Sequence, residues 1–256
     1  MFGGITMVIK ETVWIAPYEC ERRLHIYLPE DIKEGERFPV LYMFDGHNLF
    51  FDEEATYGKS WGLKKYLDEH HSRLIVVGLE CNHVGNERLS EFTPYAFYED
   101  EWGHVPEKGR VLIEWMKSDL KQYIDSKYPT LPDRLHTYIG GSSMGGLMSL
   151  YMAMCHSDTY SKAACVSPHI YPCYKYLRED LSTPMEANTQ VYISWGGQEY
   201  DPYTMAKATD QNLQIIRALL KKPGVDVIPH CFKNDDHSET AWEKELPVWM
   251  EELQIG

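Results

Sequence analysis

Short apolar runs alternate with amphipathic stretches along the chain, a pattern that predicts strands and helices in turn. Residues 12–18 and 23–28 favour strands, and the second of these alternates apolar and polar positions. Residues 38–44 are nearly all apolar, which is typical of a buried central strand, and the run stops at Asp45-Gly46. Residues 74–79 repeat that buried pattern. A helical pattern that includes Trp61, Leu63, Tyr66 and Leu67 separates the two buried runs.

The second half of the chain continues the alternation. Apolar residues at steps of three and four predict a long helix across 112–124. Further strands are expected at 135–140, 163–167, 191–195 and 225–231, and further helices at 144–156, 203–220 and 242–253. Strands of the buried type that alternate with helices predict an α/β class with a mostly parallel central sheet and helices on both faces. We expect a single domain over 1–256, with ligands bound beyond the carboxyl ends of the strands.

Residues 81–107 interrupt this order with a polar, aromatic and irregular stretch, which predicts a cap or loop insertion near a site. Aromatic residues gather in it and in a second segment, and they are Tyr95, Phe97, Tyr98, Trp102 and His104, then His169, Tyr171, Tyr174 and Tyr176. Aromatic walls suit sugar rings or phenolic acyl groups. A cap that packs on its own small core is an equally good interpretation.

Composition narrows the partners and the location. Acidic residues (39) outnumber basic residues (25), which gives a net charge of −14 and makes nucleic acid or an anionic membrane a poor partner. No apolar run reaches 18 residues, and the first residues do not have the pattern of a signal peptide. The six cysteines form no CxxC pair and are expected to be reduced, so we expect a cytoplasmic protein. The sequence is also compatible with a homo-oligomer.

The strongest chemical signal is the G-x-S-x-G formed by Gly141, Ser143 and Gly145, between an expected strand and an expected helix. A sharp strand-to-helix turn there would project the Ser143 hydroxyl from the top of the sheet as a nucleophile. The amino end of the helix that follows favours developing negative charge.

A serine nucleophile needs a base and an acid that orients the base, in the chain order serine, acid, histidine. His237 is the histidine after Ser143 that lies just beyond an expected strand and before a helix. The acid should follow the strand at 191–195, where Glu199 and Asp201 are the two candidates, and spacing alone does not choose between them. An oxyanion hole needs two backbone N–H groups, which we assign to Met144 and His47.

These motifs, taken together, resemble the putative esterase family of α/β-hydrolases, which includes feruloyl esterases, enterochelin esterases and S-formylglutathione hydrolase. The matching stretches cover roughly 20–254, and they are 41–50, 60–62, 88–94, 141–147, 167–168, 197–199, and His237 with Trp242. The resemblance implies an α/β-hydrolase fold and a serine carboxylic-ester hydrolase that works through an acyl-enzyme, without a cofactor. It also implies that Glu199 is the acid and His47 the second oxyanion donor. The chain departs from the family with His47 in place of a frequent Gln, and with Asp235 and Asp236 where glycines are frequent.

The substrate is expected to be a small acyl ester, such as an acylated or feruloylated sugar. A siderophore esterase of the enterochelin type, an acyltransferase and a non-catalytic ligand-binding protein of the same fold remain alternatives. Trp102, His169 and Arg88 are candidates for substrate binding, although an ion pair between Arg88 and Glu91 is the favoured interpretation of that arginine. No metal site is expected, because His70-His71, Cys81-x-His83 and 235–239 give no complete ligand set.

Overall fold

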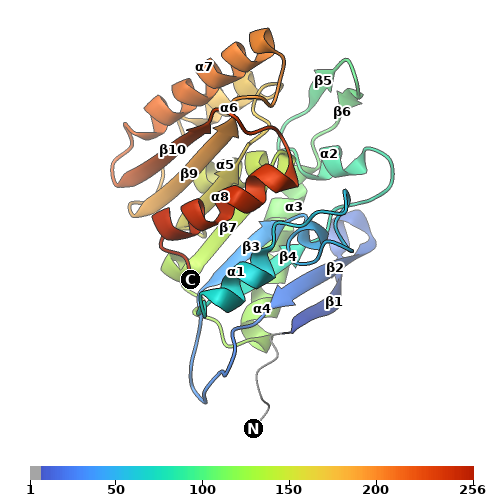
Figure 1. Cartoon of the computed structure of the whole chain (residues 1–256), viewed down its shortest axis with the longest axis vertical. Coiled ribbons are helices and arrows are strands. Elements are labelled where there is room, and N and C mark those ends of the chain that lie inside the picture. Colours follow the sequence, from blue (N-terminus) through green and yellow to red (C-terminus); the bar gives the residue numbers. More distant parts are fainter. Residues whose placement is uncertain (1–6) are drawn as a thin grey trace.

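This computed structural model describes residues 7–256, and an eight-stranded sheet forms their centre. Residues 1–6, where a signal peptide was considered, lie outside the described part of the chain. The strand order is β1-β2-β4-β3-β7-β8-β9-β10 (Figure 1). Six strands are parallel, and all of these except the edge strand β10 are largely buried, while β1 and β2 extend the sheet as an antiparallel pair. The strands are β1 (Val8–Ile15), β2 (Cys20–Tyr27), β3 (Val40–Phe44), β4 (Ile75–Leu79), β7 (Thr137–Ser142), β8 (Lys162–Val166), β9 (Thr189–Gly196) and β10 (Val225–Phe232).

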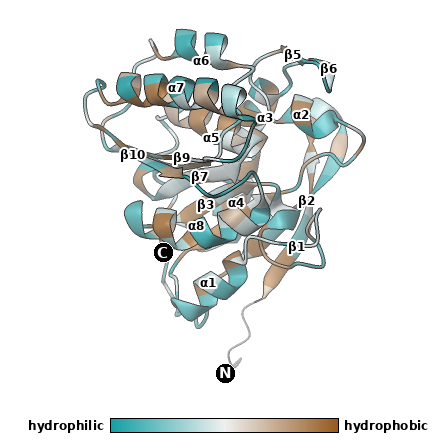
Figure 2. Cartoon of the chain, turned by 45° about the horizontal axis from the view of Figure 1, so that its top comes forward, coloured by the Kyte–Doolittle hydropathy of each residue, from teal (hydrophilic) through white to brown (hydrophobic). Residues whose placement is uncertain are grey.

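Helices cover both faces of the sheet, as the pattern predicted. One face packs on α1 (Leu63–Glu69) and α8 (Glu239–Glu252) through a core that includes Trp61, Leu67 and Trp249. The other face packs on α3 (Gly109–Trp115), α4 (Lys121–Lys127), α5 (Met144–Cys155), α6 (Tyr174–Asp180) and α7 (Pro202–Leu219). In Figure 2 most of these helices carry both hydrophilic and hydrophobic residues, which suits an amphipathic covering layer, whereas α5 is buried along nearly its whole length. The predicted α/β class is confirmed.

Several boundaries differ from the sequence expectations for local reasons. The first strand was expected at 12–18 but ends at Ile15, because Pro17 lies in a 3-10 turn (Ala16–Tyr18) closed by Glu19 at φ 50°. The long helix expected at 112–124 is continuous but includes a π-helical turn (Met116–Leu120) between α3 and α4. The short helix α6, of seven residues, was not expected at all.

The segment 81–107 is ordered rather than irregular. It contains the short helix α2 (Glu87–Glu91) and a hairpin of β5 (Phe97–Glu99) and β6 (Gly103–Val105), which stands beside α2 and apart from the main sheet (Figure 1). Tyr95 and Phe97 are buried in the core, whereas Tyr98 is exposed. The buried rings of this segment thus belong to the main core rather than to a small core of their own.

The topology places one crevice between β3 and β7. These neighbours are parallel, but the chain leaves β3 for β4 on one side and leaves β7 for β8 on the other. The loops after the two strands therefore diverge, which is where open α/β sheets bind ligands. Among residues 7–256, none of the helices combines the length and hydrophobicity that crossing a bilayer requires.

Candidate active site

Ser143 sits at the apex of the turn between β7 and α5 in a strained conformation, with φ 57° and ψ −120°. A non-glycine residue in such a region costs about 1–3 kcal/mol, so the surroundings must enforce it. The Ser143 N–H donates to the Val166 carbonyl at 3.1 Å, and the Ser143 carbonyl accepts from the His169 N–H at 3.0 Å. These bonds tie the turn to the end of β8 and hold the serine half-buried at the top of the sheet.

Glycines make this turn possible by close packing. A Cβ at Gly145 would lie 2.8 Å from Phe44 Cβ on β3, and one at Gly141 would lie 2.9 Å from the backbone of Gly145. Neither position has room for a side chain, so the first turn of α5 can approach β3 and β7 closely. The strand-turn-helix context that the G-x-S-x-G motif requires is therefore present.

His237 and Glu199 meet above this turn. The two lie in the loops after β10 and β9, and His237 Nδ1 is 3.2 Å from Glu199 Oε2. The Glu199 side chain is 4% exposed, and its other oxygen, Oε1, accepts from the Gly196 N–H. The Trp242 ring packs edge-on against the His237 imidazole at 5.1 Å, and its Nε1–H donates to Ser167 Oγ at 3.1 Å. The histidine is thus held by a buried carboxylate on one side and an anchored indole on another.

The other acids near His237 have different partners. Asp201, the alternative acid, caps α7 by accepting from the Tyr203 and Thr204 N–H groups, and it is exposed. Asp236 accepts from Ser238 Oγ at 2.5 Å, and Asp235 lies 3.9 Å from Lys244 Nζ. The geometry therefore pairs His237 with Glu199 rather than with Asp201.

Two backbone N–H groups flank the Ser143 turn. Met144 is the first residue of α5, so its N–H has no earlier helical carbonyl to bond. His47 lies in a 3-10 turn (Gly46–Asn48) after β3, whose bonds use the N–H groups of Asn48 and Leu49. A Cβ at Gly46 would clash with the Gly78 carbonyl, so glycine lets this loop sit tightly over β4. Burial lowers the pKa of His47, which keeps its ring neutral near pH 7.

Arg88 pairs with Asp45 and not with Glu91, so the favoured expectation for that arginine was wrong. Arg88 Nε and Nη2 donate to the two Asp45 carboxylate oxygens at 2.7 and 2.6 Å, while Glu91 pairs with Arg22. Burial opposes the Asp45 charge, but the Arg88 guanidinium outweighs it, and the net pKa of the carboxyl is lowered. Asp45 and Arg88 are 43 positions apart in the chain, so the spacing of residues within α2 could not reveal that they form an ion pair.

Two adjoining hollows of about 480 and 420 Å³ share Ser143, His237 and Arg88. The first extends toward His47 and Glu239, and the second toward Trp102 and His169. All three expected substrate-binding residues therefore line the same site as Ser143. A larger hollow of about 720 Å³ beside the start of α7 contains neither Ser143 nor His237.

Comparison of the whole chain with known protein families agrees with this geometry. The sequence profile of the family described as "Putative esterase" matches residues 16–252. The chain belongs to this esterase family. The fold is similar to that of an IroE-like serine hydrolase from Shewanella oneidensis, with 18% identity and a TM-score of 0.76 over 96% of this chain and 80% of that chain. BES protein from Bacillus cereus has 18% identity and a TM-score of 0.70 over 96% of this chain and 97% of that chain. Siderophore hydrolase EstA from Aspergillus nidulans has 14% identity and a TM-score of 0.72 over 96% of this chain and 95% of that chain. At these identities the likeness establishes the α/β-hydrolase fold.

The structure also shows partners of the expected site residues that the sequence pattern did not reveal. Tyr200 Oη lies 3.1 Å from His169 Nδ1, and Glu99 Oε1 lies 3.0 Å from His169 Nε2, so the His169 ring is fixed from both sides. His47 joins Cys81 and His83 in a group that could hold a metal ion, although Cys81-x-His83 alone looked incomplete. The missing signal was the pairing of β3 with β4, which brings the two loops together.

Proposed function

We propose that this esterase is a serine carboxylic-ester hydrolase in which Ser143 is the nucleophile, His237 the general base and Glu199 the acid that orients it. The observation that carries the proposal is the 3.2 Å contact of His237 Nδ1 with the buried Glu199 carboxylate, at a cavity that Ser143 also lines. The strained serine at a strand-to-helix turn supports the same assignment.

The chemistry follows from these positions. The Ser143 oxygen attacks the ester carbonyl while the second imidazole nitrogen of His237 takes its proton, and Glu199 accepts a hydrogen bond from the Nδ1–H. The N–H groups of Met144 and His47 stabilise the negative charge that develops on the carbonyl oxygen. His237 returns the proton to the leaving alcohol, and water then hydrolyses the acyl-enzyme by the same steps.

We further propose that the substrate is a small acyl ester, with Trp102 and His169 forming an aromatic wall and 81–107 acting as a cap over the site. An acylated or feruloylated sugar suits such a wall. Arg88 lies at the cavity but is neutralised by Asp45, so we do not assign it a substrate carboxylate. A siderophore ester is the second candidate, since one of the similar structures is named a siderophore hydrolase. The six free thiols support a cytoplasmic location.

The decisive experiment measures hydrolysis of p-nitrophenyl acetate and butyrate by the wild type and by three variants. We expect Ser143→Ala to lose at least about a thousand-fold in rate. Glu199→Gln should lose on the order of 10⁴-fold in kcat, because the amide no longer holds the correct imidazole tautomer. Asp201→Asn is the matched control and should keep the wild-type rate, since asparagine caps a helix as well as aspartate does.

Equal rates in the wild type and Ser143→Ala would refute the assignment of Ser143 as the nucleophile. Loss of activity in Asp201→Asn, with activity retained in Glu199→Gln, would refute the assignment of Glu199 as the acid. Acceptor-dependent turnover would favour the acyltransferase, and specific binding without turnover would favour the ligand-binding alternative. A panel of acetylated sugars, feruloylated sugars and siderophore esters, compared by kcat/KM, then identifies the substrate class.

A further inference from the structure

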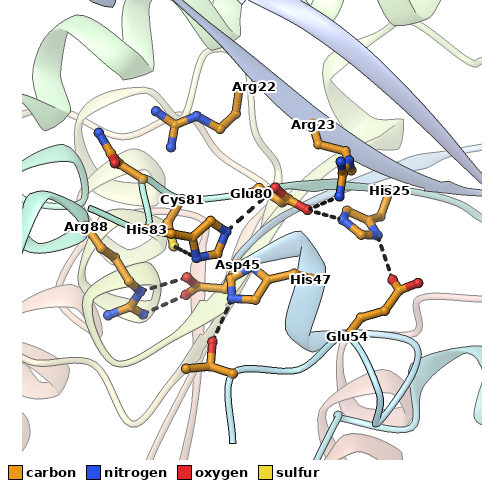
Figure 3. A network of polar contacts seen from close by, with 12 residues as sticks. Arg22, Arg23, His25, Asp45, His47, Glu54, Glu80, Cys81, His83 and Arg88 are labelled. Atoms are coloured by element: carbon orange, nitrogen blue, oxygen red, sulfur yellow. Dashed lines mark hydrogen bonds and ion pairs between the residues drawn. The ribbon is translucent and has the colours of Figure 1, made fainter. Parts of the chain in front are cut away.

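Two loops at the carboxyl ends of β3 and β4 bring together His47, Cys81 and His83. One donor atom from each residue lies within 4.8 Å of the others. The Cys81 Sγ and His83 Nδ1 atoms are 4.0 Å apart, and the His47 and His83 rings meet edge to face at 4.6 Å. Figure 3 shows the three side chains beside the Asp45–Arg88 pair.

In both His47 and His83, the ring nitrogen Nε2 lies near an oxygen atom of another side chain. His47 Nε2 is 2.9 Å from Thr56 Oγ1, and His83 Nε2 is 3.7 Å from Glu80 Oε2. His83 Nδ1 faces Cys81 Sγ, and His47 Nδ1 is buried without a hydrogen-bond partner among residues 7–256, so both nitrogens can act as donors to an ion. A histidine that binds a metal typically gives its other ring N–H to an oxygen; the His47–Thr56 contact is of this kind, whereas the His83–Glu80 distance is that of an ion pair.

We propose that His47 Nδ1, Cys81 Sγ and His83 Nδ1 bind one Zn²⁺ ion, a site separate from the esterase triad. Nitrogen and sulfur donors select an ion of this class over Ca²⁺ or Mg²⁺, which prefer oxygen. Zn–S and Zn–N bonds of about 2.3 and 2.0–2.1 Å put tetrahedral donors about 3.5 Å apart. The exposed His83 can close the small remaining gap, while the thiol proton of Cys81 is released to solvent.

The surroundings restrict which groups complete the site. Both Asp45 oxygens accept from Arg88, and Asp45 is not a member of the group whose donor atoms lie within 4.8 Å of one another. Glu80 already accepts from His25 Nε2 at 2.7 Å, and its other oxygen lies 3.7 Å from His83 Nε2, the ring nitrogen that does not face Cys81. The fourth position is therefore left to water. The bound ion would link the loop that carries His47 to the loop after β4.

The test uses the full chain freed of metal by a chelator and titrated with Co²⁺, then with Zn²⁺. Co²⁺ bound by a thiolate gives a charge-transfer absorption band, so the spectrum reports the Cys81 ligand directly and needs no substrate. We expect one Co²⁺ per chain, displacement by Zn²⁺, and a higher melting temperature with Zn²⁺ bound. Removing one of three ligands should weaken affinity by about 100-fold or more.

Three variants decide the outcome. His83→Ala changes an exposed side chain and should fold normally, Cys81→Ser tests the buried thiol, and Cys231→Ser is the matched control with an exposed thiol elsewhere. Loss of tight binding in both ligand variants, with the control unchanged, supports the site. No binding at about 100 µM Co²⁺, or binding in His83→Ala equal to that of the wild type, overturns it. If Cys81→Ser does not fold, His83→Ala and the thiolate band decide.

Discussion

Glu245 is a buried carboxyl whose ionisation should make the protein less stable at alkaline pH. It lies on α8 with 4% exposure, and its Oε1 has no hydrogen-bond partner among the described residues. Burial raises the pKa of Glu245 to about 7 from its usual 4.5, and the nearby charges of Glu199 and Asp235 add to the effect. The hydroxyls of Ser194 and Tyr192 act in the opposite direction but do not cancel it.

The magnitude follows from linkage between protonation and folding. A folded pKa above the unfolded value means that the folded state binds the proton more tightly, so stability falls as pH rises from about 4.5 through about 7. A difference of about 2.5 in pKa corresponds to about 3 kcal/mol of unfolding free energy. Glu245→Gln removes the ionisation and keeps the shape, so the variant should match the wild type near pH 4.5 and exceed its stability by about 3 kcal/mol at pH 9.

Urea unfolding of the wild type and Glu245→Gln at several pH values measures this difference. Other titrating groups are common to both proteins and cancel in the comparison. Glu251→Gln changes an exposed residue on the same helix, and its difference from the wild type should not grow with pH in this way. A Glu245→Gln difference that stays constant between pH 4.5 and 9 would refute the reasoning, because the carboxyl would then remain in one protonation state.

Three further substitutions test the packing around the site. Arg88→Met leaves Asp45 buried without its partner and should cost about 3–5 kcal/mol in urea unfolding, and a loss below about 1 kcal/mol would contradict this. Trp242→Phe removes the hydrogen bond to Ser167 that anchors the ring beside His237. We expect kcat for p-nitrophenyl acetate to fall about 10- to 100-fold with little change in KM, whereas an unchanged kcat would argue against this support. Gly145→Ala places a Cβ 2.8 Å from Phe44 Cβ and should destabilise the fold by about 1–3 kcal/mol, so an unchanged melting temperature would disprove the close contact.

The elements and the proposed nucleophile could be predicted from the sequence because their signals are local. A buried apolar run followed by Gly-x-Ser-x-Gly and a helical pattern identifies the Ser143 turn within about twenty residues. His237 follows from the same rule, since it lies just after β10 and before α8. Spacing alone did not choose between Glu199 and Asp201, although the family resemblance implied Glu199, because only the fold shows which carboxylate caps α7 and which reaches His237.

Contacts between distant segments could not be predicted in this way. Arg88 and Glu91 lie on the same short helix, and their spacing suggested an ion pair that each instead makes with a partner elsewhere. The grouping of His47 with Cys81 and His83 depends on the register of β3 against β4, which no local pattern specifies. Local propensity also missed α6, because a helix of seven residues owes its stability to the packing of Leu177 in the core.

The order of the strands has a consequence for how catalytic competence arises during folding. The proposed oxyanion donor, nucleophile, acid and base follow β3, β7, β9 and β10, and β3 pairs with β7 only after a long intervening stretch has been bridged. Such non-local pairing is slow compared with helix formation. The base comes from the loop after β10, the strand at one edge of the sheet. Recovery of enzyme activity after dilution from denaturant therefore reports assembly of the sheet from β3 to β10, which we expect later than the return of helical signal.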